Sequence, residues 1–210
     1  MIAQFMYARQ QDDPQNIQLE IETARILDLY TENAPDYGPA FTLAGQFFSF
    51  SGETEKAIEK LERANELIPE DDIAWRQRLQ LLLAAQRYDE AIDVGIEADT
   101  RVPEDAFIQY FIGTAYMLNE NSRSAVIWLE QAARAPARRP FKSIIYGTLG
   151  DAQSGLDNYE EADRVYELAL RYDPQNHNAM NNYAYNLSVR EVNLERAKEL
   201  APRAIELDSE

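Results

Sequence analysis

The chain has 210 residues, of which 37 are acidic and 20 basic, so its formal net charge is −17, and it has no cysteine and one histidine, His177. The missing cysteines exclude disulfides, zinc–thiolate sites and thiol catalysis, and the negative charge opposes binding to nucleic acids and to anionic membrane surfaces. A hydrophobic fraction of 45% suffices for a core, while no apolar run approaches the roughly 18 residues of a membrane span, so we expect no direct membrane insertion.

Residues 1–37 form the N-terminal part of the predicted fold. The motif Asp-Pro-Gln-Asn at 13–16 recurs at 173–176, which indicates that residues 1–11 are the second helix of a degenerate repeat. Residues 16–31 have the apolar spacing of one amphipathic helix. Whether it is a degenerate repeat or a separate capping helix, we expect this segment to cover the apolar face of the helices that follow.

From residue 38 onward, small residues recur with a period close to 34. The members of the first series lie 34, 34, 37 and 35 residues apart: Ala57, Ala91, Ala125, Ala162 and Ala197. Each of them is followed by a second alanine seven residues later. A further series has the same period in the preceding helix: Gly45, Leu79, Gly113, Gly150 and Ala184. Antiparallel helices approach closely where side chains are small, so these series predict five helix pairs.

Between the two alanines of a pair, a large residue fills the space that the small residues leave, as with Leu61, Leu129 and Tyr166. Prolines at 69, 103 and 174 end the pairs, because proline cannot continue a helix. Apolar residues within the helices recur at three- and four-residue spacing, and long β-branched runs are absent from the sequence. We therefore predict an all-α chain.

These residues resemble the tetratricopeptide repeat (TPR) family, whose unit is a helix–turn–helix of 34 residues. Residues 38–71 carry the pattern best, with Phe41, Ala44, Gly45, Phe48, Gly52, Ala57, Leu61, Ala64 and Pro69. The further repeats are 72–105, 106–139, 143–176 and 177–210. The resemblance implies a right-handed α-α superhelix, with residues 38–210 forming one continuous solenoid behind the cap or degenerate repeat at 1–37.

The step of 37 places three extra residues before the fourth repeat, next to the chain's one basic cluster: Arg134, Arg138, Arg139 and Lys142. Two interpretations remain open. The segment is a longer, solvated turn, or the cluster binds an anionic group of a partner or the acidic surface of a second copy.

The fifth repeat departs from the pattern at its end, where Ser209 replaces the closing proline and no capping helix follows. Residues 181–185 and 194–197 resemble a bacterial variant that is usually followed by another repeat. We therefore expect the chain to be a fragment of a longer protein.

In the family, the first helix of each repeat lines a concave peptide-binding groove through its second, fifth, ninth and twelfth positions. Carried over, the principal groove residues are Thr42, Gln46, Arg76, Gln80, Phe107, Tyr110, Thr114, Met117, Asp151, Asn178, Asn181, Asn182 and Tyr185, with Ser49, Ile73, Leu83, Ile144, Gly147, Ser154 and Ser188 at the same positions. We expect Tyr110 and Tyr185 to be exposed, whereas Phe107 and Met117 either line the groove or pack into the next repeat. A groove rich in amides and aromatics suits a peptide or helix that is neutral to basic overall.

Chaperone-binding members of the family hold a C-terminal carboxylate with lysine, asparagine and arginine, and no register of this chain supplies that cationic clamp. We therefore expect no binding of chaperone tails. Acidic pairs such as Asp89-Glu90 lie at predicted helix starts, where they complement the helix dipole, and His177 lies at another.

The predicted function is a non-catalytic scaffold for a protein or peptide partner, with no cofactor and no metal. The alternative is a structural, self-associating segment of a larger multi-repeat protein, which would make the chain a homo-oligomer. The negative charge argues against an RNA-binding helical repeat, so we expect no nucleic-acid partner. We expect a soluble chain, and its compartment stays open between cytoplasm and periplasm.

Overall fold

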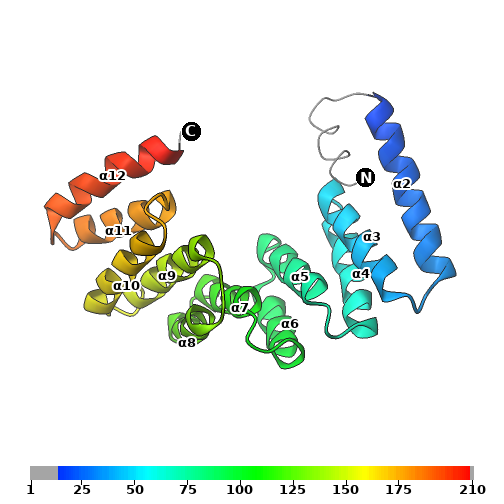
Figure 1. Cartoon of the computed structure of the whole chain (residues 1–210), viewed down its shortest axis with the longest axis horizontal. Helices are drawn as coiled ribbons and strands as arrows, with labels where there is room; N and C mark the ends of the chain where they lie inside the picture. Colours follow the sequence, from blue (N-terminus) through cyan, green and yellow to red (C-terminus); the bar gives the residue numbers. More distant parts are fainter. Residues whose placement is uncertain (1–13, 209–210) are drawn as a thin grey trace. The chain divides into compact units, whose positions relative to one another are not determined.

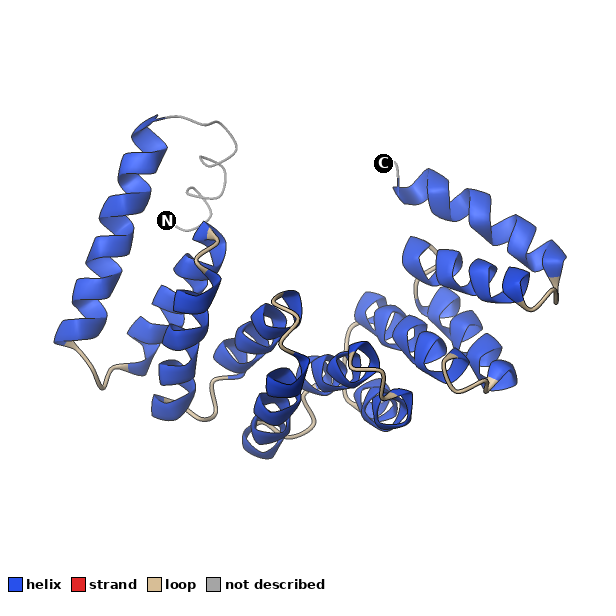
Figure 2. Cartoon of the chain, turned by 180° about the vertical axis from the view of Figure 1, so that it is seen from behind, coloured by secondary structure: helices blue, strands red, loops and turns tan. Residues whose placement is uncertain are grey.

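The computed structural model describes residues 14–208, which form eleven helices and no strand (Figures 1 and 2). The chain divides into two compact units, residues 1–103 and 104–210. The N-terminal unit contains α2 (Pro14–Asn33), α3 (Gly38–Ser51), α4 (Thr54–Leu67), α5 (Asp72–Ala84) and α6 (Tyr88–Arg101). The C-terminal unit contains α7 (Ala106–Leu118), α8 (Ser122–Arg134), α9 (Arg139–Ser154), α10 (Tyr159–Tyr172), α11 (His177–Val189) and α12 (Leu194–Asp208). The all-α prediction is confirmed.

Glycine lets the two helices of a pair approach closely, and a large side chain of the second helix fills the resulting space. A Cβ atom added to Gly150 on α9 would lie 2.7 Å from the ring of Tyr166 on α10. Gly45 and Gly113 stand in the same relation to leucines at 61 and 129. The second repeat reverses the sizes, with Leu79 in the first helix and Gly95 in the second, and both are buried. This exchange keeps the summed volume of the two positions nearly constant.

The first helix of every repeat ends in the same turn, in which one residue adopts a left-handed conformation. That residue is Gly52 in the first repeat, with φ of 80°. In the others it is not glycine: Gln86, Glu120, Asp157 and Glu191 have φ between 55° and 59°. Each turn has the paired backbone hydrogen bonds of a Schellman motif, for example from Glu120 N to Met117 O (3.1 Å) and from Asn121 N to Tyr116 O (2.8 Å).

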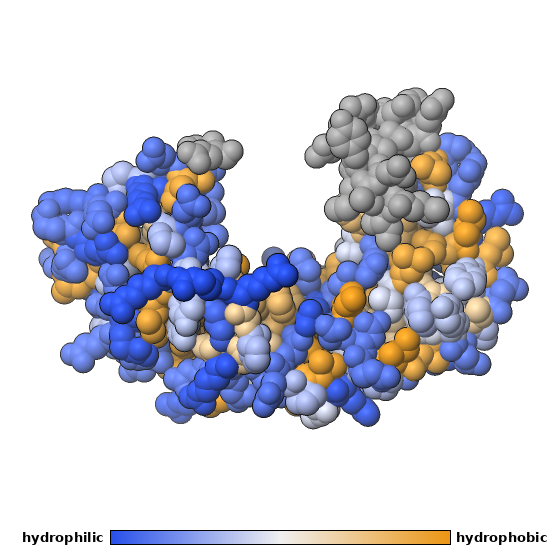
Figure 3. Space-filling model, in the orientation of Figure 1, coloured by the Kyte–Doolittle hydropathy of each residue, from blue (hydrophilic) through white to orange (hydrophobic). Residues whose placement is uncertain are grey.

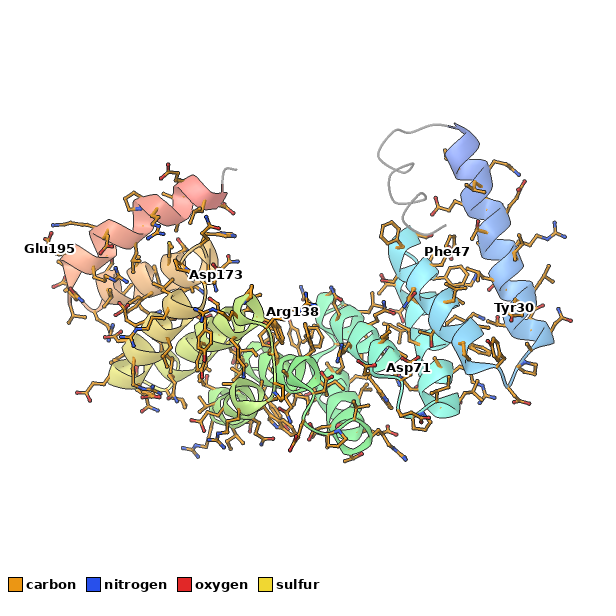
Figure 4. All side chains as sticks on the ribbon, in the orientation of Figure 1. Tyr30, Phe47, Asp71, Arg138, Asp173 and Glu195 are labelled. Atoms are coloured by element: carbon orange, nitrogen blue, oxygen red, sulfur yellow. The ribbon has the colours of Figure 1, made fainter. Side chains whose placement is uncertain are left out.

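Helix α2 packs against α3 of the first repeat and extends slightly beyond the helix predicted over 16–31. Leu27 belongs to the same core cluster as Phe48 and Phe47, the last of which is labelled in Figure 4. Much of the remaining apolar surface of α2 is exposed (Figure 3): Ile17, Leu19, Ile21, Ile26, Leu29 and Tyr30. The predicted helix over 1–11 lies outside the described residues.

The three extra residues before the fourth repeat lengthen a helix, which corrects the prediction of a longer turn. Helix α9 starts at Arg139, has Pro140 in its first turn and runs for 16 residues, against 13 or 14 in the other first helices. Proline is favoured at this position because its fixed φ matches the helix and its missing N–H would have no partner there. The insertion therefore adds about 4.5 Å to α9, at 1.5 Å per residue.

Candidate functional site

The first helices of the last three repeats border one cleft in the C-terminal unit, of about 280 Å³. Tyr110 contributes from α7, and α9 and α11 form the two walls. The lining residues are Tyr110, Ile144, Gly147, Thr148, Asp151, Asn176, Asn178, Ala179 and Asn182. Six of the positions predicted to face a groove thus lie around a single cleft. Most of the nine lining residues have polar side chains.

Asp151 is the one ionisable carboxyl group among the lining residues, and it is partly buried. Its Oδ1 accepts a hydrogen bond of 2.5 Å from the hydroxyl of Tyr166. The side-chain amide of Asn182 lies 3.1 Å from both carboxylate oxygens. Burial raises the pKa of Asp151 above its ordinary value, and the hydrogen bonds from Tyr166 and Asn182 act in the opposite direction.

A second layer of side chains fixes Tyr166 behind this carboxylate. Tyr166 is fully buried, and its ring stacks on Tyr183 at a centroid distance of 5.0 Å. Asn186 donates to the Tyr166 hydroxyl over 3.2 Å and accepts a hydrogen bond from Ser154. Because the partners of Tyr166 are themselves held, the Asp151 carboxylate is oriented by the fold.

Gly147 leaves room for the cleft between α9 and α11. A Cβ atom added there would lie 3.3 Å from the Cβ atom of Ala179, so a larger side chain would fill the cleft. At the start of α11, Asn176 accepts a hydrogen bond of 3.0 Å from Ala179 N. This backbone N–H group at the end of the cleft is therefore already bonded, as expected of a helix N-cap.

The aromatic residues predicted for the groove centre are engaged with Phe141 of α9. The rings of Phe107 and Phe141 stack at 3.8 Å, although 39% of Phe107 is exposed. Tyr110 meets Phe141 edge-on at 5.4 Å and is half-buried, so it is less accessible than predicted. Tyr185 is 69% exposed, as expected from the sequence, but does not line the cleft.

Two threonines differ from the prediction that they face a groove. Thr42 is buried, and its hydroxyl donates to Asp71 Oδ2 over 2.7 Å. Asp71 caps α5 by accepting from the backbone N–H groups of residues 73 and 74, so Thr42 supports a helix start (Figure 4). The hydroxyl of Thr114 is also buried, and it has no hydrogen-bond partner in the described part of the chain.

The remaining predicted groove residues lie outside the cleft. In the N-terminal unit, Arg76 pairs with Asp72 of the same helix at 2.7 Å, Gln46 is half-buried, and Gln80 is exposed. In the C-terminal unit, Met117 is half-buried against the cluster around Leu129, and Asn181 is exposed.

The basic cluster is largely occupied within the protein. Lys142 donates to the backbone oxygens of Ala133 and Ala135, the latter over 2.5 Å, and so satisfies free carbonyls at the end of α8. Arg139 does the same at the end of α10, with a hydrogen bond of 2.8 Å to Arg171 O. Arg134 pairs with Glu130 at 3.2 Å, and Arg138 is exposed before α9 (Figure 4). An anion-binding role of this cluster stays a prediction.

Sequence reasoning missed Thr148, Asn176 and Ala179 in the lining, and it missed the network behind Asp151. One signal for the network was available. Residue 166 is tyrosine where the first and third repeats have leucine, and a buried tyrosine hydroxyl needs a hydrogen-bond partner. Within the described range, no group of three or more metal-binding side chains occurs, and no helix is long and apolar enough to span a membrane.

Comparison with known proteins supports the repeat fold. The model of the Tetratricopeptide repeat family matches residues 144–176, which comprise most of α9 and all of α10. No curated protein matches the sequence.

Solved structures share the fold. The chain is similar to YrrB, described as a TPR protein with an unusual peptide-binding site, with 20% identity and a TM-score of 0.66 over 89% of this chain and 94% of that one. It is similar to MamA, with 14% identity and a TM-score of 0.68 over 82% and 92% of the two chains. It is also similar to PilF of Pseudomonas aeruginosa, with 17% identity and a TM-score of 0.70 over 80% and 75%.

Proposed function

We propose that this chain binds a peptide segment of a partner in the cleft of its C-terminal unit. Its fold and its matched repeat are those of a tetratricopeptide-repeat protein, which supports a role as a protein-interaction scaffold. The observation that carries the proposal is the convergence of Tyr110, Asp151, Asn178 and Asn182 from three successive first helices on that cleft. Amide side chains offer donors and acceptors to a peptide backbone, and an aromatic ring offers apolar contact.

We propose further that binding is the whole of the function, without a catalytic step. The single histidine, His177, does not line the cleft, and its Nδ1 lies 3.4 Å from Asp208 on the last helix. No cationic side chain lines the cleft, which supports the prediction against chaperone tails. YrrB, a TPR protein with an unusual peptide-binding site, gives a precedent for peptide binding on this fold.

The test compares two substitutions on one helix. Asn178 and Asn181 are both exposed on α11, and only Asn178 lines the cleft. The whole chain is screened against an array of short random peptides, and the peptides it binds are then titrated in solution. We expect Asn178→Tyr to weaken binding at least about tenfold, which corresponds to about 1.4 kcal/mol, and Asn181→Tyr to leave it unchanged. Equal affinities of both variants and the wild type, or no peptide bound at all, would contradict the proposal.

A second candidate function is self-association through the last helix pair. Apolar side chains are exposed there, with Ile205 at 70%, Val189 at 63% and Leu194 at 44%. Leu200 is 2% exposed and belongs to the core cluster of this pair, so a polar residue there would damage folding rather than test a surface. Light scattering over a concentration series tests this candidate. A dimer of the wild type that Ile205→Lys dissociates would support it, and a monomer at all concentrations would refute it.

A further inference from the structure

The Asp151 carboxylate lacks a compensating cation. Its hydrogen bonds come from the neutral side chains of Tyr166 and Asn182, and no lysine or arginine pairs with it in the part of the chain that the structure describes. Partly buried charges without an opposite charge are costly, and natural proteins rarely retain them without a use.

Arg139, Lys142 and Arg190 have other partners. Arg190, at the C-cap of α11, pairs with Asp163 at 2.5 Å and lies over the ring of Tyr159 at 4.8 Å. Lys142 of α9 is bonded to the end of α8, and Arg139 to the end of α10. A cation that complements Asp151 would therefore have to be supplied by a bound molecule.

The remaining acceptor capacity of the carboxylate identifies the kind of cation. Oδ1 already accepts from Tyr166 and Asn182, and Oδ2 accepts only from Asn182. A carboxylate oxygen has two lone pairs, so one position on Oδ2 is open. Arginine binds carboxylates best through two parallel hydrogen bonds to both oxygens, whereas a lysine ammonium is a compact charge that needs one.

We propose that the cleft takes a lysine side chain of the partner peptide, whose ammonium group pairs with Asp151 Oδ2. The inference rests on the peptide-binding function proposed above and specifies which side chain is recognised. The four-carbon stem of lysine passes between α9 and α11 beside Gly147, and the amides of Asn178 and Asn182 border the entrance for the peptide backbone. The net charge of −17 favours the approach of such a peptide.

The test varies the ligand first, because this leaves the protein intact. Each peptide that the array identifies is synthesised with blocked termini and no other basic residue, in four forms that differ at one central position: lysine, acetyl-lysine, arginine and norleucine. Fluorescence polarisation with the whole chain gives the affinities. We expect the lysine form to bind about 10- to 100-fold more tightly than the acetyl-lysine and norleucine forms, as for a hydrogen-bonded charge, and more tightly than the arginine form.

Variants of the protein then assign the effect to Asp151. Asp151→Asn should remove the preference for lysine, whereas Asp93→Asn, at an exposed position of α6, should retain it. Equal binding of the lysine and acetyl-lysine forms to the wild type would overturn the inference, as would an undiminished preference in Asp151→Asn. If binding is then still lost in Asn178→Tyr, the proposed peptide-binding function stands alone. If Asn178→Tyr binds normally, both proposals fail.

Discussion

Asp151 is a structural disadvantage, since a partly buried carboxylate without a paired cation opposes folding, and in the binding mode proposed above the same charge binds the ligand. Its environment is built from neutral groups: a tyrosine hydroxyl and an asparagine amide. Such groups hold a carboxylate in place without neutralising it. A trade of stability for binding is common at functional sites.

This trade predicts the effect of pH on the variant Asp151→Asn. The raised pKa means that the folded state binds the proton more tightly than the unfolded state, so the wild type gains stability as the pH falls through that pKa. At neutral pH, Asp151→Asn removes the charge and keeps one oxygen that accepts from Tyr166 and Asn182, while its NH2 group replaces the second acceptor of Asn182. We expect removal of the charge to dominate, so that the melting temperature is a few degrees higher. Thermal unfolding followed by circular dichroism over a pH series should show this difference narrowing on acidification. If the difference in melting temperature between the variant and the wild type widened on acidification, the pKa of Asp151 would not be raised in the folded state.

Gly150 is the residue on which the packing of the fourth repeat depends most directly. Its contact with Tyr166 leaves no space for a methyl group, and Tyr166 has no freedom to move because its ring and its hydroxyl are both held. We expect Gly150→Ala to lower the free energy of unfolding by about 1–3 kcal/mol, measured by urea denaturation. The matched control is Gly155→Ala. There the nearest atom is the Ser122 hydroxyl, which can rotate away, so the change should stay within about 0.5 kcal/mol.

At the scale of the element, the five repeats share one turn but differ in how well its residues suit it. The left-handed position is favourable for Gly52 and strained for the four side chains that occupy it elsewhere. The hydrogen bonds of the turn persist in all five repeats. Packing of the helix pairs therefore enforces the turn where the local sequence does not favour it.

Relief of this strain gives a prediction for Glu120→Gly. The left-handed conformation costs a non-glycine residue about 1–2 kcal/mol, and the greater freedom of glycine in the unfolded chain offsets about 0.4–1 kcal/mol of that gain. We expect a net stabilisation of up to about 1.6 kcal/mol, measured by urea denaturation. Glu59→Gly, in the middle of α4, is the control and should destabilise by about 1 kcal/mol. A lower free energy of unfolding for Glu120→Gly would contradict the claim that Glu120 is strained in its left-handed conformation.

At the scale of the whole molecule, the acidic excess is the dominant electrostatic property. Surface ion pairs such as Lys198–Glu195 involve only some of the 37 acidic residues, and exposed pairs contribute little. Because acidic side chains outnumber basic ones, we expect the repulsion among carboxylates to exceed the attraction within the ion pairs, and salt screens both. Added salt should therefore stabilise the fold.

The corresponding measurement is the melting temperature as a function of ionic strength. Raising sodium chloride from about 0.01 M to about 0.15 M shortens the screening length from about 30 Å to about 8 Å. We expect the melting temperature to rise, and potassium chloride at equal ionic strength to give the same shift. A melting temperature that falls with added salt would mean that attraction within the ion pairs outweighs the repulsion among carboxylates.

How far the sequence predicts this molecule differs between the fold and the site. A period of 34 residues predicts five helix pairs after residue 37, because close packing favours small residues at helix crossings. The same register brought Asp151 and Asn178 to the cleft, but it misplaced Thr42. The position of a residue within the repeat determines the side of the helix on which it lies. Whether its side chain is exposed depends also on the neighbouring repeat, as with Thr42, whose hydroxyl donates to Asp71 at the N-cap of α5. The tyrosine at 166 indicates that a buried hydroxyl needs a partner, but the network joins residues of different repeats, so no local pattern identifies its members.

The small residue that opens the cleft has an implication for how this chain acquires new ligands. The position of Gly147 recurs in the other repeats as Thr42, Arg76, Tyr110 and Asn181, so one of five equivalent positions lacks a side chain. In the binding mode proposed above, Gly147 provides the space for the ligand side chain and Asp151 provides the charge that selects it, and both lie on one helix rather than on a dedicated loop. The cleft is lined from three successive repeats, so recombination would preserve its surroundings only if it moved the third, fourth and fifth repeats together. An engineer could follow the same route and transplant the cleft as a block of three repeats instead of redesigning a surface.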